Sequence, residues 1–400
     1  MTATVGAGAR GPRSASTTPD ADDGPDGIEV AGEPETRRGR GPARRIVARY
    51  VHHPLLDVAV AFCWIPFATA AHVLQDRGDT QLLAVFISGV FLLSFAHQPL
   101  TVALVYGDPD QFRLKRAIFT WSPFLFVVAV VAGFHISLAL VAVIGGLWNA
   151  EHTLMQRYGI TRIYGRKVGQ DDGGIEKAML FSWLILALVW VGADTATPGR
   201  IAAVNLGQNN TLALEFLTRL QAAAAFLAVP LAVVVAGLVG LWAYREIRRP
   251  QLNAAKWMYL GSTAVLLALA VVDPLAAIMG YVGAHAVEYF VIVHQSLGRR
   301  YARVGPGAAT GSPAGGSPAA GDGGLLGRVV RARTGRLGFL AGYVALVLIA
   351  ITVLGRLQSP LAYTVVFFTL GGMHVFYDGF IWKLRRPEVA HSLAVPTAAP

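Results

Sequence analysis

Ten apolar segments follow one another along the chain, each close to the roughly 20 residues that a helix needs to cross a hydrocarbon core of about 30 Å. Between the seventh and the eighth stands Asp273-Pro274, where a new helix is expected because Asp suits an N-cap and Pro the first helical position. The pattern predicts an all-α polytopic membrane bundle of about ten helices. The segments lie near 55–75, 81–105, 116–134, 136–157, 178–195, 219–242, 256–272, 275–297, 337–355 and 361–382.

Basic residues collect in alternate loops between these segments. One side of the membrane receives only Arg77, Arg200 and Arg356. The other side receives Arg113, Lys115, Arg116, Arg157, Arg162, Arg166, Lys167, Lys177, Arg245, Arg248, Arg249, Lys256, Arg299, Arg300, Arg303, Arg328, Arg331, Arg333, Arg336, Lys383, Arg385 and Arg386. Because basic loops stay in the cytoplasm, we expect both termini to be cytoplasmic and the protein to be a multi-pass protein of the cell membrane.

Composition supports a membrane protein and excludes several other classes. Hydrophobic residues make up 54% of the chain and charged residues 14%, whereas a soluble domain carries about 25% charged residues. The net charge of +10 is explained by cytoplasmic loops, so no nucleic-acid partner is expected. The one cysteine, Cys63, excludes a disulfide framework and Cys-rich zinc or iron–sulfur sites. Dinucleotide, P-loop and HExxH patterns are absent.

Three segments of the chain fall outside the predicted membrane domain of residues 49–390 or interrupt it. Residues 1–48 are rich in Gly, Pro, Ala, Asp and Arg and are expected to form a disordered basic tail, because they bury too little apolar surface. Residues 305–324 have low complexity and are expected to form a cytoplasmic linker. Residues 391–400 are expected to form a C-terminal tail.

The histidines divide into two groups of five. His52, His53, His72, His135 and His391 lie at predicted membrane boundaries or in the tail, where interfacial polar residues are ordinary. The other five all lie on even-numbered helices, about 8 to 20 Å from the inner end at 1.5 Å per residue. Ionisable side chains inside spans are costly and usually face the bundle interior. This second group is His97, His152, His285, His294 and His374.

Polar residues follow these imidazoles at helical spacing, as Thr101 follows His97 and Tyr289 follows His285. His294 is nine residues from His285, about half a turn out of phase, so only one of them faces a common site well. We favour His285 because Glu288 shares its face. The predicted metal ligands are His97, His152, His285 and His374, and the candidate catalytic residues are Glu288, Tyr377 and Asp378.

Imidazoles and carboxylates without suitable thiolates form a ligand set that suits non-haem iron and, less distinctively, zinc, copper or manganese. A site inside the bilayer implies a hydrophobic substrate, such as a lipid, isoprenoid or fatty chain, that enters sideways. We therefore expect an iron-dependent oxygenase or a related redox enzyme.

One histidine on each of four helices resembles the Brp/Blh-type membrane carotene dioxygenases, and His97, His152, His285 and His374 carry the resemblance. It implies a non-haem iron held by dispersed histidines. The HxxxH and HxxHH boxes of membrane desaturases are absent.

Three alternatives remain open at this point. A proton-coupled transporter would use the buried histidines and Glu288 as relay groups. A b-type haem protein would use two histidines as axial ligands. Finally, the histidines would only hydrogen-bond between helices if their role were structural.

Overall fold

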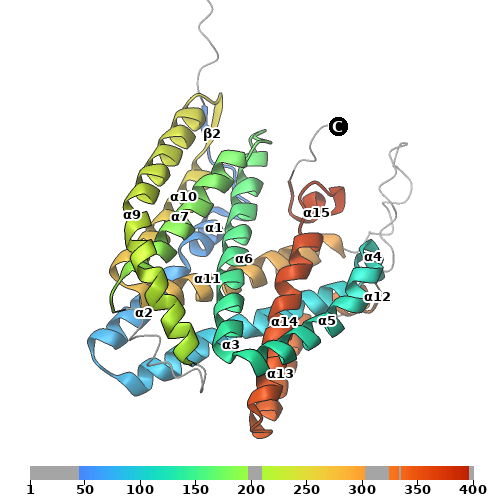
Figure 1. The fold of residues 1–400 in the computed structure, drawn as a ribbon. Coiled ribbons are helices and arrows are strands. Elements are labelled where there is room, and N and C mark those ends of the chain that lie inside the picture. Colours follow the sequence, from blue (N-terminus) through green and yellow to red (C-terminus); the bar gives the residue numbers. More distant parts are fainter. Residues whose placement is uncertain (1–44, 197–209, 302–323, 333–334, 396–400) are drawn as a thin grey trace, which may run out of the picture. The chain divides into compact units, whose positions relative to one another are not determined.

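The computed structural model describes residues 45–196, 210–301, 324–332 and 335–395, and most of these residues are helical (Figure 1). Its elements are β1 (Arg45–Val47), α1 (Pro54–Phe62), α2 (Trp64–Asp76), α3 (Thr80–Tyr106), α4 (Pro109–Leu114), α5 (Arg116–Ile136), α6 (Leu138–Arg166), α7 (Gly174–Ala193), α9 (Asn210–Ile247), β2 (Gln251–Asn253), α10 (Ala254–Val272), α11 (Pro274–Arg300), α12 (Gly324–Val330), α13 (Gly335–Arg356), α14 (Pro360–Ile381) and α15 (Pro387–Ser392). The predicted all-α fold is confirmed.

Within the described residues, nine helical segments are long and apolar enough to cross a membrane. They are α1 together with α2, then α3, α5, α7, the 218–247 part of α9, α10, α11, α13 and α14. The remaining long helix, α6, occupies the position of the predicted fourth span and has 29 residues. It is less apolar because its second half carries His152, Arg157, Arg162 and Arg166. The chain is thus a multi-pass membrane protein built as a helix bundle.

Local capping explains where several of these helices begin. Asp273 caps α11 by accepting a hydrogen bond from the Ala276 amide at 3.0 Å, and Pro274 takes the first helical position. Ser359 and Pro360 begin α14 in the same way. Such caps satisfy amides that have no partner inside the helix. The predicted break at Asp273-Pro274 is confirmed.

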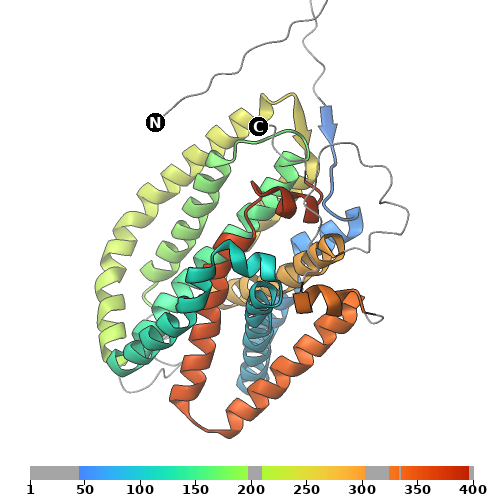
Figure 2. The same ribbon diagram turned by 90° about the vertical axis from the view of Figure 1, so that its right-hand side faces the viewer.

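The helix α11 lies at the centre of the bundle. Within its apolar 18-residue window, 72% is buried inside the protein, whereas the share in α13 is 6%. It packs against α2, α3 and α10, while α14 packs against α3 and α5. The helices α7 and α9 lie side by side (Figures 1 and 2). Residues of α11 belong to two separate apolar clusters, one with α2, α7 and α10 and one with α3, α13 and α14. Polar residues of α11 that lie between these two clusters are therefore buried.

Three cations that the sequence analysis assigned to cytoplasmic loops, Arg157, Arg162 and Lys256, are instead buried, and two of them form buried ion pairs. Arg157 on α6 forms an ion pair with Glu288, with both side chains fully buried. Lys256 on α10 forms ion pairs with Glu176 at 2.6 Å and Glu246 at 3.0 Å. The loop assignment of these residues was wrong, because charge alone does not reveal a buried partner elsewhere in the chain.

Residues near both ends of the described chain pack against the bundle. Residues 45–47, at the end of the predicted tail, pair in parallel with residues 251–253 as β1 and β2. Residues 1–44 lie outside the described residues, as does nearly all of the predicted linker, 305–324. The predicted C-terminal tail begins within α15, and Val395 beyond it is 5% exposed.

Candidate metal centre

Four imidazoles from four helices meet beside α11. Nε2 of His374 lies 3.1 Å from Nε2 of His97 and 3.0 Å from Nε2 of His152. The ring of His285 lies 4.6 Å from that of His97 and 5.1 Å from that of His152, centroid to centroid. The helices α3, α6, α11 and α14 contribute one residue each. The structure brings together all four of the predicted ligands.

The spacing of these nitrogens is compatible with one metal ion. Two nitrogen ligands about 2.1 Å from a metal and at right angles to each other are about 3.0 Å apart. Direct hydrogen bonds would account for the cluster less well, because a ring nitrogen offers one proton or one lone pair and Nε2 of His374 faces two others. Two overlapping sets bring single ligand atoms within 4.8 Å of one another: His97, His285 and His374, and His152, His374 and Asp378.

The burial of His285 is a second observation that favours a metal. Its side chain is 0% exposed, and within the described part of the chain neither ring nitrogen has a hydrogen-bond partner. A buried polar group without a partner costs about 1–3 kcal/mol. Coordination of one ring nitrogen would remove part of that cost.

The opposite side of the His374 ring is fixed by a short chain of hydrogen bonds. Nδ1 of His374 lies 2.7 Å from the hydroxyl of Thr101, which donates to Oδ1 of Asp378 at 2.9 Å. Tyr289 donates to the same carboxylate oxygen at 3.1 Å and also contacts the Thr101 hydroxyl. Since the Thr101 proton points to the carboxylate, its lone pair accepts Nδ1–H. This arrangement leaves the Nε2 lone pair of His374 directed at the cluster, as a metal ligand requires.

Backbone geometry helps to place His97. Pro99 lies inside α3, and a proline in a helix removes the hydrogen bond to the carbonyl four residues earlier, here Phe95. The adjacent carbonyl of Ala96 accepts a hydrogen bond from Tyr343 of α13 at 2.7 Å. The turn that carries His97 is therefore held by a neighbouring helix as well as by its own backbone.

Of the three candidate catalytic residues, the structure places only Asp378 at the imidazoles. Glu288 binds Arg157 at 2.7 Å and Gln156 at 3.0 Å, and it belongs to neither ligand set. The Tyr377 hydroxyl lies between those of Tyr106 and Ser122, at 2.9 and 2.8 Å. Both residues lie on the correct helices, but neighbouring helices draw their polar ends away from the centre.

Sequence reasoning did not list Thr101, Tyr289 and Arg157 as site residues. The first two were detectable from their spacing of four residues after His97 and His285, which places them on the same helix faces. Arg157 gave a misleading signal, because a basic residue near a helix end resembles a loop cation.

The remaining histidines lie outside the cluster. His294 is half-buried, and its carbonyl accepts a hydrogen bond from Arg336 at 3.1 Å. His52 and His72 pair with Asp57 and Asp273. His53 caps α1, and His135 and His391 lie on exposed parts of α5 and α15.

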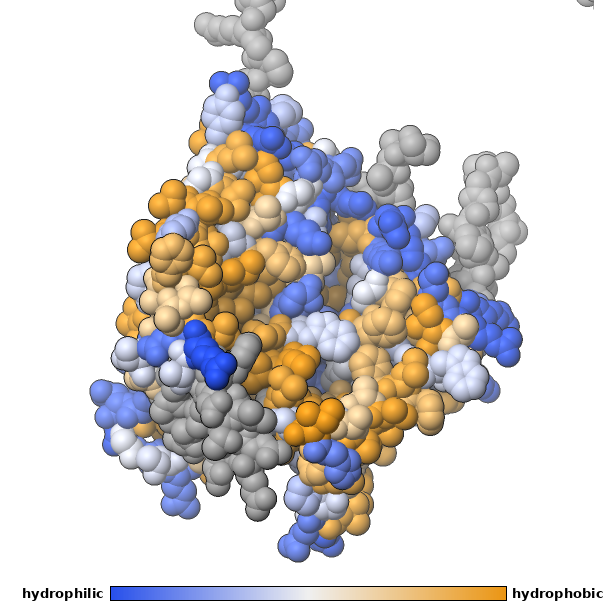
Figure 3. All heavy atoms as spheres, viewed as in Figure 1, coloured by the Kyte–Doolittle hydropathy of each residue, from blue (hydrophilic) through white to orange (hydrophobic). Residues whose placement is uncertain are grey.

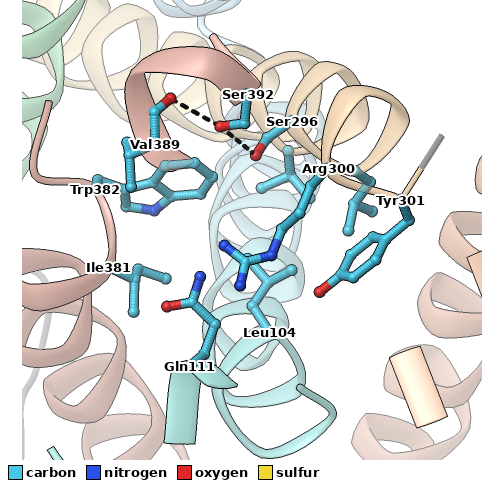
Figure 4. Close-up of a pocket in the computed structure, with 11 residues that line it drawn as sticks. Leu104, Gln111, Ser296, Arg300, Tyr301, Ile381, Trp382, Val389 and Ser392 are labelled. Carbon is cyan, nitrogen blue, oxygen red and sulfur yellow. Dashed lines mark hydrogen bonds between the residues drawn. The ribbon is translucent and has the colours of Figure 1, made fainter. Parts of the chain in front are cut away.

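A small pocket lies near the four imidazoles but does not reach them. Its volume of about 30 Å³ suits about two water molecules. Arg300 and Gln111 extend into it from α11 and α4, beneath Ser296 and Ser392 (Figure 4). The ring of Trp382 forms one wall and meets Tyr289 edge-on, with 6.2 Å between centroids. These two rings separate the pocket from the imidazoles.

At the same end of α11, Tyr301 donates to Oδ2 of Asp108 at 2.5 Å, and Arg300 binds the same oxygen. Burial raises the pKa of Tyr301 above its ordinary value, so the phenol remains protonated as this hydrogen bond requires.

Comparison with protein-family models, curated proteins and solved structures found no match to the chain. The resemblance to the carotene dioxygenases therefore depends on the placement of the four histidines alone.

Proposed function

We propose that the protein is a metal-dependent oxygenase, or a related redox enzyme, of the cell membrane that holds non-haem iron and acts on a hydrophobic lipid or isoprenoid substrate. The observation that carries the proposal is the meeting of four buried imidazoles, in which Nε2 of His97 and Nε2 of His152 each lie within 3.1 Å of Nε2 of His374. Four separate helices contribute to it, so no local sequence pattern accounts for the meeting.

Donor chemistry supports iron. Imidazole nitrogens with one carboxylate and no thiolate form a set that iron accepts readily, while zinc, copper and manganese are the competitors. Cys63 is the only cysteine in the chain, and neither ligand set includes it. Iron bound here would supply redox chemistry with dioxygen.

The protein's own residues would orient and enclose this chemistry. Asp378 and Thr101 hold the tautomer and the direction of His374. His97, His285 and His374 are 0% exposed, so water is excluded and side reactions with it are suppressed. Because His97, His285 and His374 lie on helices that are long and apolar enough to span the membrane, a hydrophobic molecule in the bilayer is the natural substrate.

The haem alternative agrees poorly with the same distances. Two axial nitrogens on opposite sides of a haem iron are about 4 Å apart, with the macrocycle between them. The Nε2 atoms here are 3.0 and 3.1 Å apart, and their rings touch at centroid distances of 4.6 and 4.7 Å. A porphyrin would have to separate them.

Metal analysis of the purified full-length protein, loaded anaerobically with Fe(II), tests the proposal. We expect stoichiometric iron, no Soret band, and oxygen consumption that increases when membrane lipid extract is added. His97→Ala, His152→Ala, His285→Ala and His374→Ala should each lose most of the iron. The matched variants His72→Ala and His135→Ala should keep it. Iron retention by all four cluster variants, or a wild type that binds no metal, would overturn the proposal.

A further inference from the structure

The metal centre is buried, and its least enclosed residues lie on one side. His97, His285 and His374 are 0% exposed, whereas His152 is 7% exposed and Asp378 is 9% exposed. The last two residues come from α6 and α14. The centre is therefore least enclosed where these two helices face each other.

The helices α6 and α14 touch at both ends of this side. At one end, a Cβ on Gly145 of α6 would lie 2.8 Å from the ring of Phe368 on α14. At the other end, Arg166 of α6 donates a hydrogen bond to the carbonyl of Leu384, just beyond α14, at 2.8 Å. Between these two contacts, Figure 3 shows the surface hollowed between α6 and the corner where α14 meets α15.

Helical spacing predicts which residues face the open stretch. Met155 and Gly159 follow His152 by three and seven residues, so they share its face of α6. Val375 and Gly379 lie on the face of α14 that carries Phe368. A Cβ on Gly159 or on Gly379 would meet no atom within 4 Å. We call this stretch the lateral window and define it by Met155, Gly159, Val375 and Gly379, with His152 and Asp378 at its inner end.

We propose that the lateral window admits the hydrocarbon chain of a single-chain amphiphile with an anionic head group. The inference rests on the proposed function and names its substrate class. The helix α14 spans the membrane, so acyl chains are the surrounding medium, and the four residues that line the window are uncharged. Methionine adapts to varied apolar shapes, which suits a flexible chain.

The basic end of the window selects the head group. Arg166 and Lys383 lie at the end where α6 approaches the corner of α14 and α15. The helix α14 ends at Ile381, which is seven residues or about 10 Å beyond His374. Lys383 lies just past this end, with its Nζ 5.3 Å from the centre of the Phe380 ring. A carboxylate bound at Lys383 would leave the middle of its chain beside the imidazoles. The reacting carbon is therefore a mid-chain carbon and not one next to the head group.

Photolabelling of the iron-loaded full-length protein in lipid nanodiscs tests this inference without an activity assay. The probe is a fatty acid with a diazirine in the middle of its chain. We expect labelled peptides that contain residues 155–159 and 375–379. Gly379→Trp and Gly159→Trp should lower that labelling about tenfold, which corresponds to about 1.4 kcal/mol of binding free energy. Gly146→Trp, at an exposed glycine of α6 with open space beside it, is the matched control and should label like the wild type.

The outcomes separate this inference from the proposed function. Labelling of α9 and α13 as strong as that of the window would overturn the window, and the wild-type map alone decides this if a tryptophan variant fails to fold. Equal labelling by the same chain with an amine head group would overturn the head-group assignment. Window labelling by protein that binds no metal would overturn the oxygenase and leave the window standing. Iron binding without window labelling would do the reverse.

Discussion

The hydroxyl of Thr101 lies 2.7 Å from Nδ1 of His374, and it donates to Asp378 at 2.9 Å. Two helices that are far apart in the sequence thus fix the orientation of one imidazole. The relationship explains why Asp378 is buried in an apolar bundle, since a buried carboxylate is tolerated only when its oxygens are bonded.

Thr101→Val keeps the shape of the side chain and removes the hydroxyl. We expect the affinity for iron to fall about 10–100-fold, the usual effect of losing a partner that orients a ligand. Competition with a chelator measures the affinity. The control is Thr352→Val, because the Thr352 hydroxyl bonds to the Leu348 carbonyl of its own exposed helix face. Unchanged affinity in Thr101→Val would show that Thr101 does not orient His374.

Substitution of the two histidines of α11 tests how this helix is oriented about its own axis. His285→Ala should release most of the iron, whereas His294→Ala should retain it, because nine residues rotate a helix by two and a half turns. His285 is 0% exposed and touches the other imidazoles, while His294 is half-buried beside Arg336. Metal content by mass spectrometry is the measurement. The opposite pattern would mean that α11 is turned by half a turn.

The buried pair Arg157–Glu288 should matter for stability and not for metal content. Arg157→Leu leaves the Glu288 carboxylate buried and unpaired, and we expect a loss of about 3–5 kcal/mol in the free energy of unfolding. The double variant Arg157→Leu/Glu288→Leu should be more stable than the single one. For the wild type and both variants, the free energy of unfolding in mixed micelles and the iron content of the folded fraction are measured. If the Glu288→Gln variant folds normally but loses iron, the prediction is wrong and Glu288 is a metal ligand.

Membrane topology is predicted from the distribution of basic residues. A reporter fused after Lys383 should register in the cytoplasm, and one inserted near Gly207 should register outside. A reporter at the N-terminus should match the first of these. Reporters at Lys383 and Gly207 on the same side would contradict the alternation of the helices.

The two carboxylates show where sequence reasoning reaches its limit. Glu288 follows His285 by three residues and Asp378 follows His374 by four, so helical periodicity treats them alike. Which one reaches the imidazole cluster depends on the helix opposite. Arg157 of α6 binds Glu288, whereas Thr101 of α3 binds Asp378 and connects it to His374.

The sequence by itself determined the features that depend on neighbours along the chain. Apolar runs of about 20 residues placed the spans, and caps such as Asp273 placed a helix start that the structure has at Pro274. Histidine positions on four helices identified the residues that meet. Each is a local property, because helix length, capping and side-chain phase are set within a few turns.

Only the tertiary structure decided the contacts between helices. It turned Tyr377 toward Tyr106 and Ser122, and it paired Arg157 and Lys256 with buried carboxylates. It also brought α6 and α14 together at His152, whose Nε2 lies 3.0 Å from that of His374. The physical reason is that a buried polar group must find a partner. Several residues on a helix face have the right phase, and packing of distant segments selects among them.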